Sequence, residues 1–187
     1  TDQVFDMTEP PASVLVWGSA GPIEVEMASL LNDFGCKVYL IAESRRILPM
    51  EDGDTSQRIA QSLREQGVEI LPRYSLKSVQ KSDEGYDCSL DGSDEKTVSV
   101  KKVLVSARKP NTARLGLEEA GVSLKDDGGI DINDQLETTV KEIYAIGDAT
   151  GGWMLSHAAS SMAVVAAENA MGGAKVYPHH LIPRGIW

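Results

Sequence analysis

The alternation of apolar and polar residues in the first quarter of the chain predicts two strands around a helix. Apolar runs over Ser13–Trp17 and Lys37–Ala42 are typical of buried parallel strands. Residues 23–34 between them have helical spacing and stop at Gly35, a residue that favours a helix C-terminus. The apolar face predicted for this helix consists of Ile23, Met27, Leu30, Leu31 and Phe34. Together these elements predict a β-α-β unit.

The pattern over the next 65 or so residues predicts one more helix and five more strands. Thr55–Gln66 has helical spacing, and a short strand follows at Val68–Leu71. Three alternating runs, at residues 74–81, 86–90 and 97–101, are separated by turns rich in Gly and Asp. They predict a half-exposed antiparallel meander, after which an apolar strand at Val103–Ser106 returns to the parallel sheet. The fold class predicted is α/β: a doubly wound, Rossmann-like domain with a three-stranded antiparallel β-meander.

The pattern changes at Arg108, where a connecting segment begins. Short strands are predicted at Ile130–Ile132 and Ile143–Ile146, and a helix is predicted from Met154 to the glycine pair at 172–173. One side of that helix carries Ala158, Met162, Val165 and Asn169. The two ends of the chain, residues 1–12 and 175–187, show no periodicity, and we expect the first of them to be extended.

Composition and charge narrow the class of protein. The 187 residues are 42% hydrophobic, and no apolar run is long enough to predict a membrane span. The N-terminus lacks the basic start and apolar core of a secretory signal. The formal net charge of −10 argues against nucleic acid or an anionic membrane surface as a partner. Much of the acidic excess falls at Asp83–Glu84 and Asp91–Glu95, where we expect hairpin loops.

The two cysteines, Cys36 and Cys88, have neither CxxC nor C-x4-C spacing. We predict that they are small buried side chains in a reducing compartment, which indicates a cytoplasmic protein, or one of the mitochondrial matrix if the source is eukaryotic. We predict no metal site.

The turn after the first strand carries the candidate chemistry. A strand that leads into a helix through glycines presents backbone N–H groups to a dinucleotide pyrophosphate. The candidate cofactor-binding residues in this turn are Gly18, Ser19, Ala20, Gly21, Pro22 and Ile23. Counted back from Glu26, the glycine positions of the G-x-G-x-x-G pattern hold Ser19, Gly21 and Glu24. The Glu24 carboxylate would repel a bound pyrophosphate, so nucleotide binding by this turn is an open question at this point.

Four stretches of the chain stand out as motifs: Arg46-Ile-Leu-Pro49, Arg108-Lys-Pro-Asn-Thr112 with Leu115–Val122, Thr138–Asp148, and Met154-Leu-Ser-His157. With them the chain resembles flavin-dependent pyridine nucleotide–disulfide oxidoreductases, and within that family the dihydrolipoamide dehydrogenases. The resemblance implies that residues 12–128 are the NAD(P)-binding domain and residues 129–174 the second half of the FAD-binding domain. Residues 1–11 and 175–187 would then be linkers.

The resemblance also implies that this chain is the middle piece of a longer protein. The first FAD half, the redox-active cysteine pair and the dimerisation domain would lie elsewhere in that protein, which is expected to be a homodimer. For this reason no catalytic residue is assigned in this chain.

Further cofactor-binding residues follow from the resemblance. Glu26 would face the nicotinamide ribose, Ala107 would stand where the family has a glycine near that ribose, and Leu76 would contact the adenine side. For FAD, Gly147 would permit a close turn and the Asp148 carboxylate would accept a hydrogen bond from the ribityl chain. The start of the last helix would lie near the flavin with Met154, Leu155, Ser156 and His157.

The end of the second strand bears on the choice between NAD and NADP. An acidic residue there accepts hydrogen bonds from the ribose 2′-OH, whereas arginines hold a 2′-phosphate. The expected acidic position holds Ala42, and Glu43 follows one residue later, which favours NAD. Arg45 and Arg46 keep NADP as the alternative.

The function predicted is hydride transfer between NAD(H) and an FAD/disulfide pair, as part of a dihydrolipoamide dehydrogenase-like flavoprotein. One alternative is a non-catalytic relative, either a nucleotide sensor or a structural subunit, with an eroded NAD site. Another is a mercuric reductase or soluble transhydrogenase of the same layout. The partners expected are a nicotinamide dinucleotide and the FAD and dimerisation segments of the same protein.

Overall fold

The computed structural model describes residues 2–106 and 108–186, which fall into two compact units. The first unit comprises Thr1–Ala107 together with Ile186–Trp187, and the second comprises Arg108–Gly185. Each unit has its own hydrophobic clusters.

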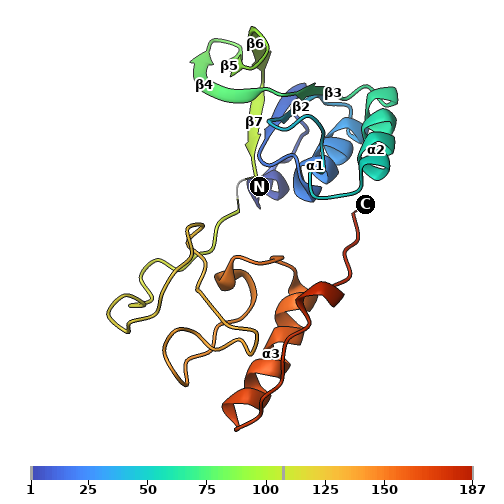
Figure 1. Cartoon of the computed structure of the whole chain (residues 1–187). Coiled ribbons are helices and arrows are strands. Elements are labelled where there is room, and N and C mark those ends of the chain that lie inside the picture. Colours follow the sequence, from blue (N-terminus) through green and yellow to red (C-terminus); the bar gives the residue numbers. More distant parts are fainter. Residues whose placement is uncertain (1, 107, 187) are drawn as a thin grey trace. The chain divides into compact units, whose positions relative to one another are not determined.

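The first unit is built on a four-stranded parallel sheet (Figure 1). Its strands are β1 (Ser13–Trp17), β2 (Lys37–Ala42), β3 (Glu69–Pro72) and β7 (Lys102–Val105), in the order β3-β2-β1-β7. The α/β prediction is therefore confirmed. The chain adds β2 and β3 on one side of β1 and later returns to add β7 on the other side.

Different layers cover the two faces of this sheet, because successive strand residues point to opposite sides. On one face, Val14 and Val16 pack with α1 (Pro22–Asp33) and α2 (Gly53–Glu65). On the other face, Leu15 and Ile41 pack against the three-stranded meander. The meander strands are β4 (Ser75–Ser82), β5 (Gly85–Asp91) and β6 (Glu95–Val100), paired antiparallel as predicted.

The face that α1 buries differs from the predicted one. Its buried residues are Glu24, Val25, Ala28 and Leu31, whereas Ile23, Met27 and Leu30 are only half-buried. Phe34 at its end is 62% exposed. The helix is rotated so that small residues contact the sheet, and Ala28 allows close approach of helix and strands. This rotation also turns Glu24 inward, where sequence periodicity alone would place an exposed charge.

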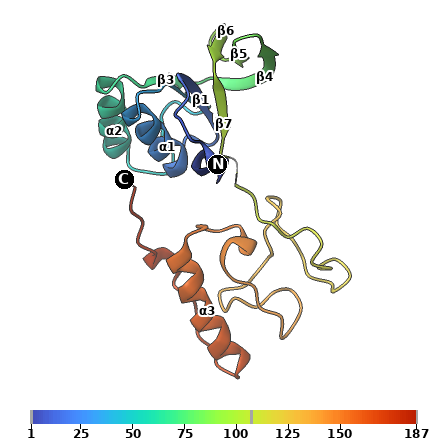
Figure 2. The same ribbon diagram turned by 180° about the vertical axis from the view of Figure 1, so that it is seen from behind.

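The second unit contains little regular structure (Figure 2). Short 3-10 helices lie at Gly147–Thr150 (η2) and His179–Leu181 (η3), and α3 spans Ser156–Ala170. The buried side of α3 is the predicted one, with Met162 and Val165 in a cluster with Leu136 and Tyr177.

The predicted strands at 130–132 and 143–146 were wrong. Residues there form isolated antiparallel bridges: Leu124 with Ile130, Ile132 with Thr138, and Glu137 with Tyr144. Closely spaced turns interrupt each pairing after one bridge. At one of them, Asn133 accepts hydrogen bonds from the backbone N–H groups of Gln135 and Glu137. Ile130 is buried and Ile132 half-buried, whereas Ile143 and Ile146 are exposed, at 38% and 37%. The sequence therefore indicated burial correctly at 130–132 but not at Ile143 and Ile146.

The N-terminal segment, the acidic loops and the cysteines were also predicted from the sequence. The lead-in forms a 3-10 helix at Asp2–Asp6 (η1) where an extended segment was predicted. The acidic segments 83–84 and 92–94 are hairpin loops, as expected. Cys36 and Cys88 are free and buried, and burial raises the pKa of each thiol. Within the described part of the chain, no helix is both long and apolar enough to cross a bilayer.

Candidate functional site

The glycine turn lies where the order of strands in the parallel sheet reverses. β2 and β7 flank β1 on opposite sides, so the carboxyl ends of β1 and β7 form a topological switch point. Trp17 and Val105 are register partners at this edge, and the Ser106 backbone N–H donates to the Trp17 carbonyl at 3.0 Å. Open α/β sheets bind ligands outside the carboxyl ends of their strands at such a point.

The Glu24 side chain turns back from α1 into this turn. Its Oε2 accepts a hydrogen bond from the Gly21 backbone N–H at 2.7 Å, and the Ser19 hydroxyl lies 3.4 Å from the same oxygen. Its Oε1 accepts from the Ser106 hydroxyl at 2.5 Å. The Glu24 side chain is buried, with 2% of the residue exposed. The structure therefore brings together Ser19, Gly21 and Ser106 around one carboxylate.

The Ala20 backbone carries strain at this turn. Ala20 has a φ of 52°, in the left-handed region, and is completely buried. Its carbonyl accepts from the Leu48 backbone N–H at 2.7 Å, which ties the turn to the loop after β2. Pro22 is the first residue of α1, a position where its missing N–H costs nothing.

The structure also describes Ala42, Glu43, Glu26 and Leu76 of the first unit. Ala42 is completely buried at the end of β2, and Glu43 after it is exposed. Glu26 is half-buried on α1. Leu76 on β4 packs against the cluster between the sheet and the meander. Ala107 lies outside the described residues, so its predicted contact stays a prediction, as do those of Glu26, Glu43 and Leu76.

Arg46, kept above as a possible ligand for a 2′-phosphate, is engaged by the backbone of its own loop. Its guanidinium donates to the carbonyls of Pro49 at 3.2 Å and Glu51 at 2.9 Å. In this conformation Arg46 organises the loop after β2. Because its guanidinium is already hydrogen-bonded, Arg46 is a weaker candidate for binding the 2′-phosphate of NADP than the sequence alone indicated.

In the second unit, Gly147 and Asp148 begin η2 next to α3. Gly147 has a φ of 64°, and a Cβ there would lie 3.0 Å from the Cβ of Ala159. Glycine is therefore favoured here by both the backbone conformation and the close contact with α3. The Asp148 carboxylate forms a 2.7 Å ion pair with Arg108, whose other nitrogen donates to the Met154 carbonyl at 3.1 Å. Both charged side chains are about half exposed.

The four residues from Met154 to His157 form the entry to α3. Met154 has a φ of 50°, and Leu155 is the extended N-cap residue, which gives the helix no side-chain cap. The helix starts at Ser156, two residues later than predicted. His157 is exposed, and its Nε2 lies 2.8 Å from the Pro183 carbonyl.

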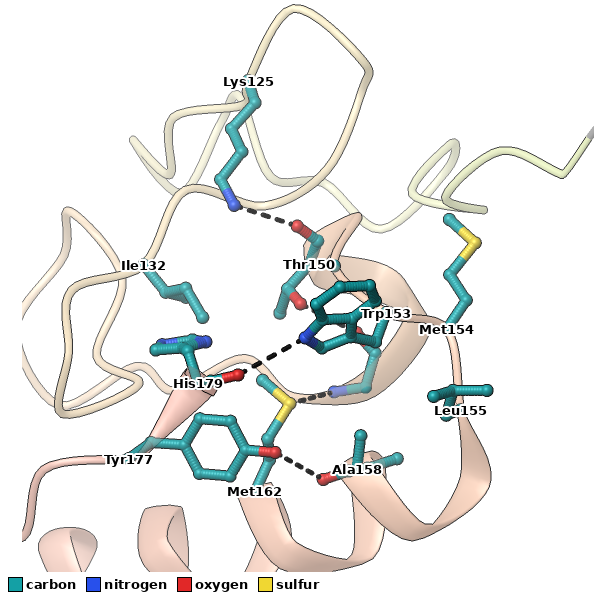
Figure 3. A pocket seen from close by; sticks show the side chains of 13 residues that line it. Lys125, Ile132, Thr150, Trp153, Met154, Leu155, Ala158, Met162, Tyr177 and His179 are labelled. Carbon is teal, nitrogen blue, oxygen red and sulfur yellow. Dashed lines mark hydrogen bonds between the residues drawn. The ribbon is translucent and has the colours of Figure 1, made fainter. Parts of the chain in front are cut away.

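A cavity of about 490 Å³ lies beside these residues (Figure 3). Of the predicted FAD contacts, Gly147, Met154 and Leu155 line it. Aromatic side chains line it as well: the Trp153 indole N–H donates to the His179 carbonyl at 3.4 Å, and Tyr177 contacts the His179 ring edge-on. The cavity has the size and mixed lining typical of a small-molecule site.

Three features of these sites were not predicted from the sequence. Ser106 was predicted only as the end of an apolar strand, although a polar residue at the carboxyl end of a parallel strand can indicate a binding site. Arg108 had no role assigned beyond its motif. No sequence pattern predicts that Tyr177 and His179 line the cavity, because both lie in the C-terminal segment, which has no periodicity. Among the described residues, no group of three His, Cys, Asp or Glu side chains is placed to hold a metal ion.

Comparison with known proteins decides the family. The family model described as pyridine nucleotide-disulphide oxidoreductase matches residues 1–163. The chain belongs to this family. Dihydrolipoyl dehydrogenase of Corynebacterium glutamicum is 36% identical over 175 residues, which cover 91% of this chain and 37% of that protein. The enzyme of Bacillus subtilis is 35% identical over 190 residues, covering 98% and 38%.

Solved structures of the same family share the fold. LpdA from Mycobacterium tuberculosis superposes with a TM-score of 0.84 at 28% identity, over 94% of this chain and 38% of that one. The HOCl-induced flavoprotein disulfide reductase RclA from Escherichia coli gives 0.81 at 29% identity, over 92% and 39%. This chain thus spans less than two-fifths of the length of the relatives named here.

The two sites differ in how well they fit the cofactors that this oxidoreductase family implies. The second unit fits a flavin contact better, because Gly147, Met154 and Leu155 line one cavity, although the Asp148 carboxylate does not line it and is paired with Arg108. The turn of the first unit does not fit a pyrophosphate as it stands. The Glu24 carboxylate already takes the Gly21 N–H that a phosphate oxygen would use.

Proposed function

We propose that this chain is the middle part of a dihydrolipoyl dehydrogenase-like flavoprotein. In this proposal, residues 12–128 bind a nicotinamide dinucleotide and residues 129–174 supply the second half of an FAD site. The observation that carries it is the glycine turn at the switch point of the sheet, in a chain that dihydrolipoyl dehydrogenases match over more than 90% of its length. NAD is preferred to NADP because Arg46 is engaged by its own loop.

The residues of the second unit have separate roles in this proposal. Asp148 would accept a hydrogen bond from the ribityl chain, which requires sharing its carboxylate with Arg108. The α3 N-terminus, which has no side-chain cap, would turn its N–H groups and positive dipole end toward the flavin. A bound flavin supplies two-electron transfer between a nicotinamide and a disulfide. The disulfide would belong to a segment outside this chain.

The longer protein is proposed to act as a homodimer in a reducing compartment such as the cytoplasm, which agrees with two buried free thiols. The relatives named above favour this function over that of a mercuric reductase or a soluble transhydrogenase.

The test uses the longer protein that contains this sequence. We expect it to purify with the absorbance of an oxidised flavin, and anaerobic dihydrolipoamide should reduce that flavin before any nucleotide is added. Subsequent NAD⁺ should reoxidise it with formation of NADH. A colourless protein, or a flavin that dihydrolipoamide leaves oxidised, would contradict the proposal.

A further inference from the structure

The Glu24 carboxylate is surrounded by hydrogen-bond donors that carry no formal charge. They are the Gly21 backbone N–H at 2.7 Å, the Ser106 hydroxyl at 2.5 Å and the Ser19 hydroxyl at 3.4 Å. Glu24 also lies in the first turn of α1, where the positive end of the helix dipole favours an anion. Backbone N–H, hydroxyl groups and a helix N-terminus are the donors with which proteins bind phosphate.

The carboxylate also fills the space inside the turn. A Cβ built on Gly18 would lie 2.1 Å from Glu24 Oε1, so this oxygen rests directly against the Gly18 backbone. Glu24 is 2% exposed, and Gly21 at the start of the helix is also buried. The glycines that would allow close approach of a pyrophosphate here allow close approach of a side chain of the protein itself.

A second anion cannot share this position. A phosphate oxygen on the Gly21 N–H would lie within about 3–4 Å of the buried carboxylate, where two like charges repel strongly. We propose that Glu24 is an internal anion that occupies the phosphate-binding position of the turn. A nicotinamide dinucleotide then binds tightly only when this side chain has swung out. The inference rests on the proposed function, because it assumes that the turn is the dinucleotide site.

Opening this position requires the Glu24 side chain to give up these hydrogen bonds. Every hydrogen bond to the carboxylate described above comes from an uncharged donor. Rotation of the Glu24 side chain into solvent would free the Gly21 N–H and the Ser19 and Ser106 hydroxyls together. These groups would then face an incoming phosphate. Glu24 thereby lowers the affinity of the turn for dinucleotide without removing the donors.

The test is calorimetric titration of the 187-residue chain with NADH. Glu24→Ala removes both charge and bulk, and Glu24→Gln keeps the bulk and removes the charge. Asp33→Asn is the matched control, because Asp33 is an exposed acid on the same helix and the change in net charge is equal. We expect both Glu24 variants to bind NADH at least about tenfold more tightly than the unaltered chain. Asp33→Asn should bind like the unaltered chain, and circular dichroism checks that each variant is folded.

Each of the other outcomes overturns the inference, and each has a different consequence for the proposed function. Equal or weaker binding by both Glu24 variants, beside measurable binding by the unaltered chain, would show that Glu24 is no obstacle and would leave the proposed function standing. Tighter binding by Glu24→Ala alone would assign the obstruction to bulk and overturn competition by charge. Absence of binding in every variant would overturn the inference and the dinucleotide part of the proposed function together. The reduction of flavin by dihydrolipoamide, which needs no nucleotide, tests the rest of that function separately.

Discussion

The hydroxyl of Ser106 donates a hydrogen bond to Oε1 of Glu24 at 2.5 Å, joining residues 82 positions apart in the sequence. One residue comes from the first turn of α1 and the other follows the end of β7. Both are at least 95% buried. This single contact links the glycine turn to the strand that returns from the meander, and so couples the proposed binding site to the stability of the sheet.

Loss of this contact should destabilise the first unit. Glu24→Ala leaves the Ser106 hydroxyl and the Gly21 N–H without their partner, and each buried group costs about 1–3 kcal/mol. Native-state hydrogen exchange of the β1 and β7 amides measures the effect in this unit alone. Asp33→Asn should change it by less than about 0.5 kcal/mol. In a double-mutant cycle of Glu24→Ala with Ser106→Ala, each of which removes the hydrogen bond, we expect a coupling of about 0.5–3 kcal/mol. Strict additivity would mean that the hydrogen bond contributes nothing.

Gly18 should tolerate a side chain only when Glu24 is absent. A Cβ at Gly18 would meet Glu24 Oε1 at 2.1 Å, so Gly18→Ala should cost about 1–3 kcal/mol in the unaltered chain. In the Glu24→Ala background the three atoms nearest to that Cβ are absent, and the same change should cost less. Hydrogen exchange of the β1 amides gives both values. An equal cost in the two backgrounds would contradict the position of the carboxylate.

Gly147 should be more sensitive to substitution than a glycine of the same backbone conformation elsewhere in the second unit. Gly147→Ala adds a 3.0 Å contact with Ala159 on α3 to the strain of a φ of 64°. Gly116 has a φ of 66°, but a Cβ there has its nearest contact at 3.7 Å, so Gly116→Ala reports the strain alone. We expect Gly147→Ala to lower the protection of the α3 amides by about 1 kcal/mol more than Gly116→Ala. Equal effects would place α3 farther from the turn than described.

The buried thiols should make the first unit sensitive to alkaline pH. Burial raises the pKa of Cys36 and Cys88 above the ordinary value of 9.0, with Asp87 adding to the effect at Cys88. The unfolded chain therefore releases these protons first. The stabilisation is fully present below about pH 9 and is lost as the pH rises through the folded pKa values.

The measurement compares the unaltered chain with Cys88→Ala between about pH 8 and about pH 11. The difference in unfolding free energy should shrink as the pH rises, because only the unaltered chain has the Cys88 thiol to ionise. A thiol reagent should also modify both cysteines slowly at neutral pH in the folded state. A pH-independent difference would contradict the burial of Cys88.

The order of strands and helices in the first unit was predictable from the sequence. Strands such as Ser13–Trp17 and Lys37–Ala42 were placed at their observed bounds, because buried parallel strands are continuous apolar runs flanked by glycine. The buried side of α3 was also predicted, since helical spacing decides which residues share a face.

The sequence failed where the environment decides the conformation. Ile130–Ile132 has the composition of a strand, but turns on both sides leave only isolated bridges, from Ile130 to Leu124 and from Ile132 to Thr138. The apolar spacing of α1 predicted its buried face only in part, since Leu31 is buried as predicted but Ile23 and Met27 remain half-buried. Glu24 and Ala28, which were not predicted, are buried.

By itself, the sequence determined the α/β class, the family motifs and the glycine turn, because these depend on local periodicity and on residues close together in the chain. It also showed that Glu24 stands in a glycine position. Only the tertiary structure decided what that carboxylate does. Its donor Ser106 lies 82 residues away in sequence, and parallel pairing of β1 with β7 is what brings the two together. The pairing of Arg108 with Asp148, 40 residues apart, likewise depends on the folded chain, because no local pattern encodes which distant groups meet.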